Sequence, residues 1–284
     1  MNIIIRIIIL SLTVVLSTVN AQDFQGVATY RTQRSFDIKM DSTKVNDAMQ
    51  AQMMEMMKKQ FQKTYILTFD KSSSIYKQEV ELAKPSVGMG GDFQITSFGG
   101  GGGSDVFYKN IQSQNYVDQK ETMGKNFLIK DSISPIAWKL GSESKYIGEY
   151  LCFNATYTRQ VAVMKKKSFS VNSEENEDAE PEMEDRIVSA WYTTQIPVNN
   201  GPAKYQGLPG LILEVHDGKL NIICSKIVIN PEEKVEIVAP DKGKELNQEE
   251  YDKIIDKKRK EMMERYAPRK GGKSGEVIEI RIGG

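Results

Sequence analysis

The sequence predicts a mainly β protein of the α+β class: a large curved antiparallel sheet, either open or closed halfway into a barrel, with two helices packed on or beside it. Two observations support this fold class. Short segments with alternating apolar and polar residues recur along the chain between turn-forming residues, and only two segments carry apolar residues at helical spacing. The composition, 39% hydrophobic and 27% charged, is that of a folded domain.

The chain is organised around residues 190–224. Within this stretch, Leu208-Pro209-Gly210-Leu211 fits a type II turn, because proline presets φ at the second position and glycine accepts a positive φ at the third. Residues 211–216 then alternate, and Asp217-Gly218 is a two-residue signal for a type I′ hairpin. Two antiparallel strands are therefore predicted over residues 211–216 and 219–229.

The turn also fixes the expected register of this hairpin. With Asp217 and Gly218 as the loop, Val215 faces Leu220, and the pairs Leu213–Ile222 and Leu211–Cys224 follow in step. One face is then wholly apolar, and the other face is mixed. The apolar face consists of Leu211, Leu213, Val215, Leu220, Ile222 and Cys224. We expect this hairpin to be a central part of the core sheet.

Further strands are predicted on both sides of the hairpin from the same alternation. They are expected over residues 24–34, 65–69, 74–82, 106–110, 114–119, 125–131, 137–140, 151–164, 186–194 and 276–282. The last of these carries a row of isoleucines and would suit the edge of a sheet.

Two helices are predicted. The first, over residues 45–63, has a methionine stripe that includes Met49, Met53 and Met57. Thioether side chains adapt to irregular apolar partners, so the stripe fits a binding surface, although it also fits simple packing on the sheet. The second helix begins after Asn247, which with Glu250 forms a capping-box pattern.

Residues 1–21 have the layout of a cleavable signal peptide: one positive charge at Arg6, an apolar run, and small residues before Gln22. The alternative is a membrane anchor, but the apolar run is shorter than the roughly 20 residues that a span needs. We expect a periplasmic or secreted protein, cleaved near Ala21. Residues 22–284 then form a single β-rich domain without a transmembrane span.

Flexible loops are expected near residues 85–105 and 165–185. The first contains five consecutive glycines, Gly99 to Gly103, but a strand pattern follows instead of the helix that a phosphate-binding loop requires. The second is acidic and lacks the spacing of a calcium loop. The sequence therefore predicts no metal and no cofactor site. The near-neutral charge balance also argues against nucleic-acid binding.

The candidate site residues are few. Cys152 and Cys224 are the two cysteines, so they form either one disulfide or two buried free thiols. His216 is the single histidine and stands beside a turn, with no nucleophile at a spacing that suggests catalysis. Four aromatic residues are candidates either for the core or for a ligand or partner face. They are Trp138, Trp191, Tyr192 and Tyr205.

The string Gly207, Leu208, Pro209, Gly210, Leu211, Ile212 resembles the name motif of the GLPGLI family of secreted proteins from Bacteroidetes-type bacteria. Gly148-Glu149-Tyr150-Leu151-Cys152 and Ala190-Trp191-Tyr192-Thr193 are also similar to that family. The resemblance covers residues 127–230. It implies an export signal, a mostly β fold and association with outer-membrane receptor systems, with no established biochemical activity.

The sequence therefore predicts an exported, non-enzymatic binding or accessory protein whose curved sheet holds a hydrophobic ligand or a partner segment. The alternative is a structural or interaction module of an outer-membrane receptor or assembly system, with an envelope protein as partner. A third class, a hydrolase, finds no support in the order or spacing of polar residues.

Overall fold

The computed structural model describes residues 24–35, 55, 62–79, 105–163 and 182–266. Over these ranges the chain forms one twelve-stranded sheet with the long helix α3 (Gln248–Tyr266) beside one end. The strands are β1 (Gln25–Arg34), β2 (Lys63–Asp70), β3 (Ser73–Gln78), β4 (Val106–Asn110), β5 (Asn115–Thr122), β6 (Lys125–Ser132), β7 (Lys139–Ile147), β8 (Tyr150–Val163), β9 (Glu182–Thr193), β10 (Leu211–Asp217), β11 (Leu220–Ile229) and β12 (Lys244–Leu246).

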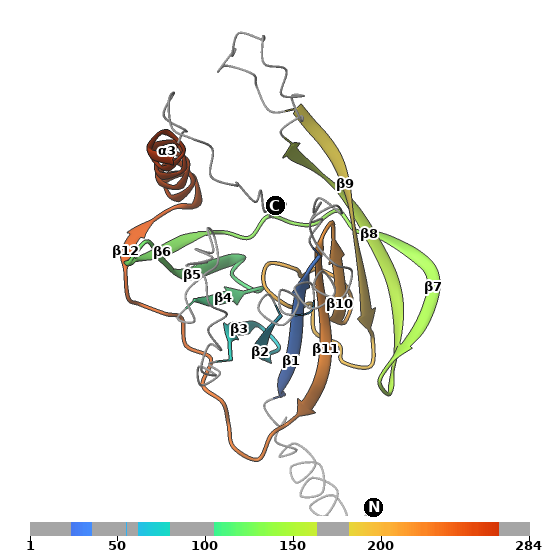
Figure 1. Ribbon diagram of the computed structural model, residues 1–284. Helices are drawn as coiled ribbons and strands as arrows, with labels where there is room; N and C mark the ends of the chain where they lie inside the picture. Colours follow the sequence, from blue (N-terminus) through green and yellow to red (C-terminus); the bar gives the residue numbers. More distant parts are fainter. Residues whose placement is uncertain (1–23, 36–54, 56–61, 80–104, 164–181, 267–284) are drawn as a thin grey trace, which may run out of the picture.

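The sheet is open and strongly curved (Figure 1). Its strand order is β12-β6-β5-β4-β3-β2-β1-β11-β10-β9-β8-β7, and each neighbouring pair is antiparallel apart from β12 and β6, which are parallel. The predicted mainly β class and large antiparallel sheet are confirmed. The end strands β12 and β7 do not pair with each other, so the sheet of the described strands is open and is not closed into a full barrel.

The two predicted helices have different outcomes. α3 is present where the second was expected, and its capping box forms: Glu250 N donates to Asn247 Oδ1 and Asn247 N donates to Glu250 Oε2. The first predicted helix falls mostly outside the described residues. Glu55 within it is helical, but its expected last residue, Lys63, belongs to β2. The methionines of its stripe, the 276–282 strand and most of both expected flexible loops also fall outside the described residues. The last four residues of the second loop, 182–185, are described and belong to β9 instead.

The central hairpin is confirmed, but its register differs from the prediction by two residues. Val215 faces Ile222 and Asp217 faces Leu220, so the loop is Gly218-Lys219 instead of Asp217-Gly218. Gly218 has φ +60°, as suits glycine at the first central position of a hairpin turn. The shift has an even number of residues, so Val215, Leu220 and Ile222 keep their common face. Leu211 does not share it, because β10 bulges between Ile212 and Glu214 and this bulge places Leu211 on the opposite face. Asp217 stays in the strand because its carboxylate is held inside the protein, as described below.

The predicted type II turn at Leu208–Leu211 is wrong. Gly210 has no positive φ; instead its N–H donates to Leu208 O at 2.8 Å, which closes a tighter three-residue turn centred on Pro209. Glycine is needed at position 210 because of space. A Cβ there would lie 2.0 Å from the carbonyl oxygen of Thr193 on the neighbouring strand.

Two groups of buried apolar residues form the interior. The larger core joins β1–β3 and β8–β11 and includes Tyr30, Leu67, Val188 and Leu213. The smaller core consists of Phe127, Ile129 and Leu246, and α3 packs on it through Tyr251 and Ile254. Among the described helices, none is long and apolar enough to cross a membrane.

Candidate functional site

The segment between β9 and β10, residues 194–210, packs onto the larger core; we call it the linking loop. Its buried side chains include Ile196, Val198, Tyr205 and Leu208. The two ends of the loop are joined by backbone hydrogen bonds, Leu211 N to Ile196 O at 3.0 Å and Ile212 N to Asn200 O at 3.0 Å. The motif residues Gly207 to Ile212 thus form the exit of a closed loop that belongs to the core.

Lys109 in β4 holds the linking loop from the far side of the curved sheet. Its ammonium group donates to the carbonyl oxygens of Gly201, Ala203 and Tyr205 at 2.7, 2.8 and 2.9 Å. The side chain is fully buried. Four strands separate β4 from β10 in the sheet order, so this contact joins regions that the strand ladder keeps apart.

Burial lowers the pKa of Lys109 to about 7, since a charged group is poorly solvated inside a protein. The three carbonyl acceptors act in the opposite direction, because they favour the charged ammonium. No carboxylate among the described residues pairs with Lys109. Its ligands are therefore backbone dipoles, and its role is to satisfy loop carbonyls that would otherwise be buried without donors.

Asn200 adds a second polar contact between the loop and the sheet. Its Oδ1 accepts hydrogen bonds from Ser74 Oγ of β3 at 3.1 Å and from Gly201 N at 2.9 Å. Gly201 fits closely here, since a Cβ at this position would lie 2.7 Å from Ile212 Cβ. The loop is therefore fixed by both hydrogen bonds and close packing.

Asp217, at the end of β10, is the centre of a buried polar group. Its Oδ2 accepts a hydrogen bond from Tyr205 Oη at 2.7 Å, and Arg159 Nη2 donates to both carboxylate oxygens at 2.9 Å. Burial alone raises the pKa of Asp217, but the hydrogen bonds from Arg159 and Tyr205 outweigh this and hold the pKa below its ordinary value. Asp217 is thus charged and paired, and it ties the loop to β8 and β10.

A second polar group lies beside Trp191 on β9. Glu214 pairs with Lys145 of β7 at 2.7 Å and with His216, and the Lys145 ammonium lies 4.3 Å from the centroid of the Trp191 ring. Burial raises the pKa of Glu214, but the hydrogen bonds from Lys145 and His216 bring it below the ordinary value. His216 therefore belongs to a hydrogen-bonded group around Glu214, and its ring also contacts Asn221.

The predicted site residues do not form one surface. Tyr205 is a buried side chain of the linking loop. Trp138 donates from Nε1 to Gln206 O at 2.9 Å and packs edge-on against Tyr157. Tyr192 is buried against Phe153. Trp191 lies elsewhere, with Lys145. The structure thus makes Trp138, Tyr192 and Tyr205 parts of the core instead of one aromatic platform.

Cys152 and Cys224 are both buried free thiols. Burial raises the pKa of Cys152 to about 11 and that of Cys224 to about 12. Their sulfur atoms instead lie 3.5 Å from the carbonyl oxygens of Tyr150 and Lys226. High pKa values leave little thiolate at neutral pH, so neither thiol is a reactive nucleophile in this state.

Three polar residues of the site were not identified from the sequence: Lys109, Arg159 and, in its interior role, Asp217. Lys109 shares a face of β4 with Phe107, and a lysine on an otherwise apolar face is the one signal that could have identified it. Across the described ranges, no three His, Cys, Asp or Glu side chains gather as ligands for a metal ion.

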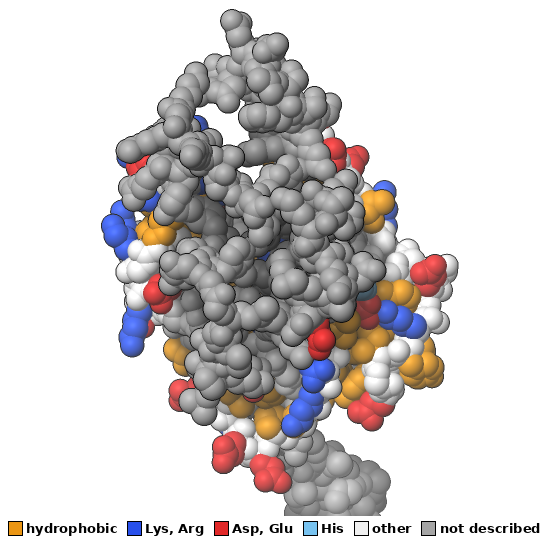
Figure 2. Space-filling model, viewed as in Figure 1, with side chains coloured by type: hydrophobic (Ala, Val, Ile, Leu, Met, Phe, Trp, Pro, Cys, Tyr) orange, Lys and Arg blue, Asp and Glu red, His pale blue; other side chains and the backbone are white. Residues whose placement is uncertain are grey.

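The β7 end of the sheet has several hydrophobic side chains on its surface. Large hydrophobic side chains there lie open to solvent, namely Leu140, Tyr146, Met183 and Ile187. Figure 2 shows orange hydrophobic atoms gathered on this side, over the region of β7 to β10, with charged side chains between them.

Comparison with known proteins gives a limited result. Residues 138–214, less than a third of the chain, match one family model. That family is described as a protein of unknown function (Porph_ging) and is of the Bacteroidetes type. The match includes β7 to β9 and the linking loop. No curated protein matches the chain.

Two solved structures are similar to part of the chain, both of PNGF-II, in space groups C2 and P21. Each has a TM-score of 0.46, with 14% and 13% sequence identity. The similarity covers 83% of this chain but only 33% and 34% of the solved chains. The present chain thus spans about a third of the length of those proteins.

Proposed function

We propose that this protein is an exported, non-enzymatic binding or accessory protein that holds an extended segment of a protein partner at the β7 end of its sheet. The observation that carries the proposal is the state of β7. Seven of its nine residues are exposed, and within the described ranges its one neighbour is β8. Such an edge offers free backbone N–H and C=O groups to an added strand.

The side chains of β7 favour an apolar partner segment. Leu140 faces Ala155 and Tyr146 faces Leu151 on β8, so both lie on the same face of the sheet. They are 63% and 72% exposed. An added strand with apolar residues at alternate positions would cover both side chains and extend the core by one strand.

The edge also has features that limit indiscriminate pairing. The register of β7 shifts between Leu140 and Ser144, and the charged residues Lys139 and Glu143 lie on the strand. Irregularities and charges of this kind protect natural sheet edges from aggregation. A partner must therefore match a short, interrupted edge. This favours one specific partner segment over pairing with any exposed strand.

A partner segment is better supported than a hydrophobic small molecule. The larger core is covered by the chain's own linking loop, whose Ile196, Tyr205 and Leu208 are buried there. The part of the chain that the structure describes therefore leaves no apolar interior for a ligand beneath this loop. An interaction module of an outer-membrane receptor system is the second candidate, favoured by the GLPGLI-type resemblance.

Site-specific photo-cross-linking tests the proposal. A photo-reactive amino acid at Tyr146 should capture a discrete protein in cells that produce this chain. The matched control places the same residue at Val238, which is 65% exposed and lies in the segment that leads to β12. No adduct at position 146, or equal adducts at both positions, would contradict the proposal.

A further inference from the structure

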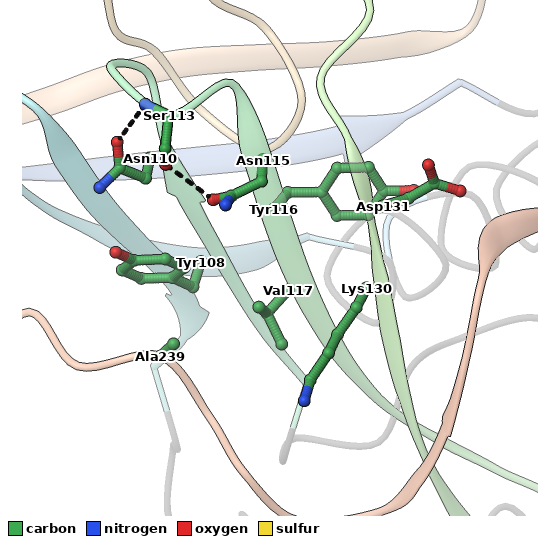
Figure 3. Close-up of a pocket in the computed structure, with 9 residues that line it drawn as sticks. All are labelled: Tyr108, Asn110, Ser113, Asn115, Tyr116, Val117, Lys130, Asp131 and Ala239. Carbon is green, nitrogen blue, oxygen red and sulfur yellow. Dashed lines mark hydrogen bonds between the residues drawn. The ribbon is translucent and has the colours of Figure 1, made fainter.

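A second surface lies far from β7, where β4, β5 and β6 form a hollow of about 520 Å³ (Figure 3). Tyr108, Val117 and Lys130 face one another across the three strands. Lys109, the next residue after Tyr108, points into the protein toward the linking loop, and successive residues of a strand point to opposite faces. Tyr108, Val117 and Lys130 are therefore on the face opposite the loop.

The floor and one wall of the hollow are apolar. Figure 3 shows Val117 near the middle, with the Tyr108 ring and Ala239 on one side of it and Lys130 on the other. Ala239 comes from the segment between β11 and β12, so the hollow combines strand and loop residues. Ligand sites commonly combine such apolar surfaces with a few fixed polar groups.

The fixed polar groups come from the turn between β4 and β5. Asn110 Oδ1 accepts a hydrogen bond from Ser113 N at 2.9 Å, and Ser113 Oγ donates to Asn115 Oδ1 at 3.1 Å (Figure 3). These bonds occupy the oxygen of each amide. The Asn115 amide nitrogen has no partner among the described residues, so it can donate two hydrogen bonds into the hollow.

The charges around the hollow are already compensated. Lys130 forms an ion pair with Glu245. The Asp131 carboxylate accepts hydrogen bonds from Ser132 N at 2.7 Å and from Gln248 N at 3.1 Å. Since each charge already has a partner, the hollow carries no unpaired charge among these groups, which favours an uncharged ligand over an ion.

We propose that this hollow binds a neutral saccharide. A sugar ring has an apolar C–H face that packs on an aromatic ring such as Tyr108, and its hydroxyl groups are acceptors for amide donors such as Asn115. The volume falls within the range of small-ligand sites, about 300–1,000 Å³. The open shape suits a ligand whose remaining hydroxyl groups stay in water. This site goes beyond the proposed function, which concerns β7.

The test is a titration of the full chain with lactose, maltose and N-acetylglucosamine, with sialyllactose as the charged counterpart, followed by the NMR amide shifts of residues 108–117. At least one neutral sugar should shift these amides. Tyr108→Ala should weaken that binding about fivefold, since an aromatic contact contributes on the order of 1 kcal/mol. Tyr108→Phe keeps the ring and should change it less than about threefold.

Two further variants keep the result interpretable if Tyr108→Ala does not fold. Asn115→Ala removes the amide donor at an exposed turn residue and should also weaken binding. Tyr146→Ala, an equally simple loss of an exposed tyrosine at the other end of the sheet, should leave binding unchanged. Absence of binding by all three neutral sugars, a preference for sialyllactose, or binding that withstands Asn115→Ala would each overturn the proposal.

Discussion

The larger and the smaller core of this sheet are held in different ways. The larger core buries two polar anchors of the linking loop: Lys109, which binds the loop from the distant strand β4, and Asp217, which binds Tyr205 from β10. The smaller core has three buried residues, and α3 is fixed above it by contacts nearer the surface. Tyr116 Oη donates to Gln248 Oε1 at 3.0 Å, and the Thr122 hydroxyl bonds to Tyr251 Oη at 2.9 Å.

This difference shows how burial divides one sheet into cooperative units. Opening the linking loop exposes groups from β1, β3, β4 and β10 at once, so it requires most of the larger core to separate. Lifting α3 exposes only the smaller core. Segments with few buried contacts open locally at low free energy, whereas buried ones open only with the whole protein. We therefore expect mutations in the two cores to have global and local effects respectively.

The largest expected effect is that of Lys109→Met. The methionine fills most of the same volume but leaves three loop carbonyls without donors. Each unsatisfied buried acceptor costs about 1–3 kcal/mol, so we expect the free energy of unfolding to fall by about 3 kcal/mol or more. Urea unfolding followed by circular dichroism measures this. Lys139→Met on exposed β7 is the matched control and should change stability little.

The pH dependence of the unfolding free energy, compared between the wild type and Lys109→Met, tests the charge state of Lys109. The pKa of Lys109 is lowered to about 7 in the folded protein, from the ordinary value of 10.5. Between these values the unfolded chain binds the proton that the folded chain has lost, so wild-type stability rises with pH. The stability difference between wild type and Lys109→Met should therefore widen from pH 7 toward pH 10. A constant difference would show that the carbonyls keep Lys109 charged.

A smaller global effect is expected for Gly210→Ala. Its Cβ would lie 2.0 Å from Thr193 O, which is backbone and cannot move aside freely. We expect a loss of about 2–3 kcal/mol, as for overpacking elsewhere. Gly207→Ala is the control: φ there is +92°, but a Cβ would lie 3.9 Å from the nearest atoms of Trp138, so only backbone strain of about 1–2 kcal/mol applies. A larger loss at Gly207 would contradict the steric argument.

The smallest effect is expected in the smaller core. Asn247→Ala removes the cap of α3 and should cost about 1 kcal/mol. Hydrogen exchange should become faster in α3 while the amides of the linking loop stay protected. Asn126→Ala, a change of an exposed asparagine on β6, should have neither effect. Faster exchange in the linking loop after Asn247→Ala would show that the two cores are one cooperative unit.

Local patterns predicted the elements well. The alternation of residues 211–216 and 219–229 is enough to identify β10 and β11, and Asn247 and Glu250 define the start of α3 because the two partners are three residues apart. β7 was predicted too short, since Gly141, Ser142 and Ser144 are weak strand formers. β12 has only three residues and depends on pairing with β6.

The polar anchors could not be predicted for a different reason. The partners of Lys109 lie 92 to 96 residues away in the sequence. A local sequence pattern cannot predict a contact over such a separation. Asp217 was assigned to the turn because Asp-Gly is a strong hairpin signal. Its contacts with Arg159 and Tyr205 decide the register instead, so tertiary hydrogen bonds outweighed the local preference for one loop over another.

The pairing of β1 with β11 has a consequence for synthesis. Gly26 lies opposite Ile229, and Gln25 N bonds to Asn230 Oδ1 across 205 residues of sequence. A ribosome must therefore complete most of the polypeptide before β1 gains its second neighbour. Until then one edge of β1, whose Ala28 and Tyr30 belong to the larger core, has no neighbouring strand. Nascent chains should therefore fold slowly and benefit from a holding chaperone.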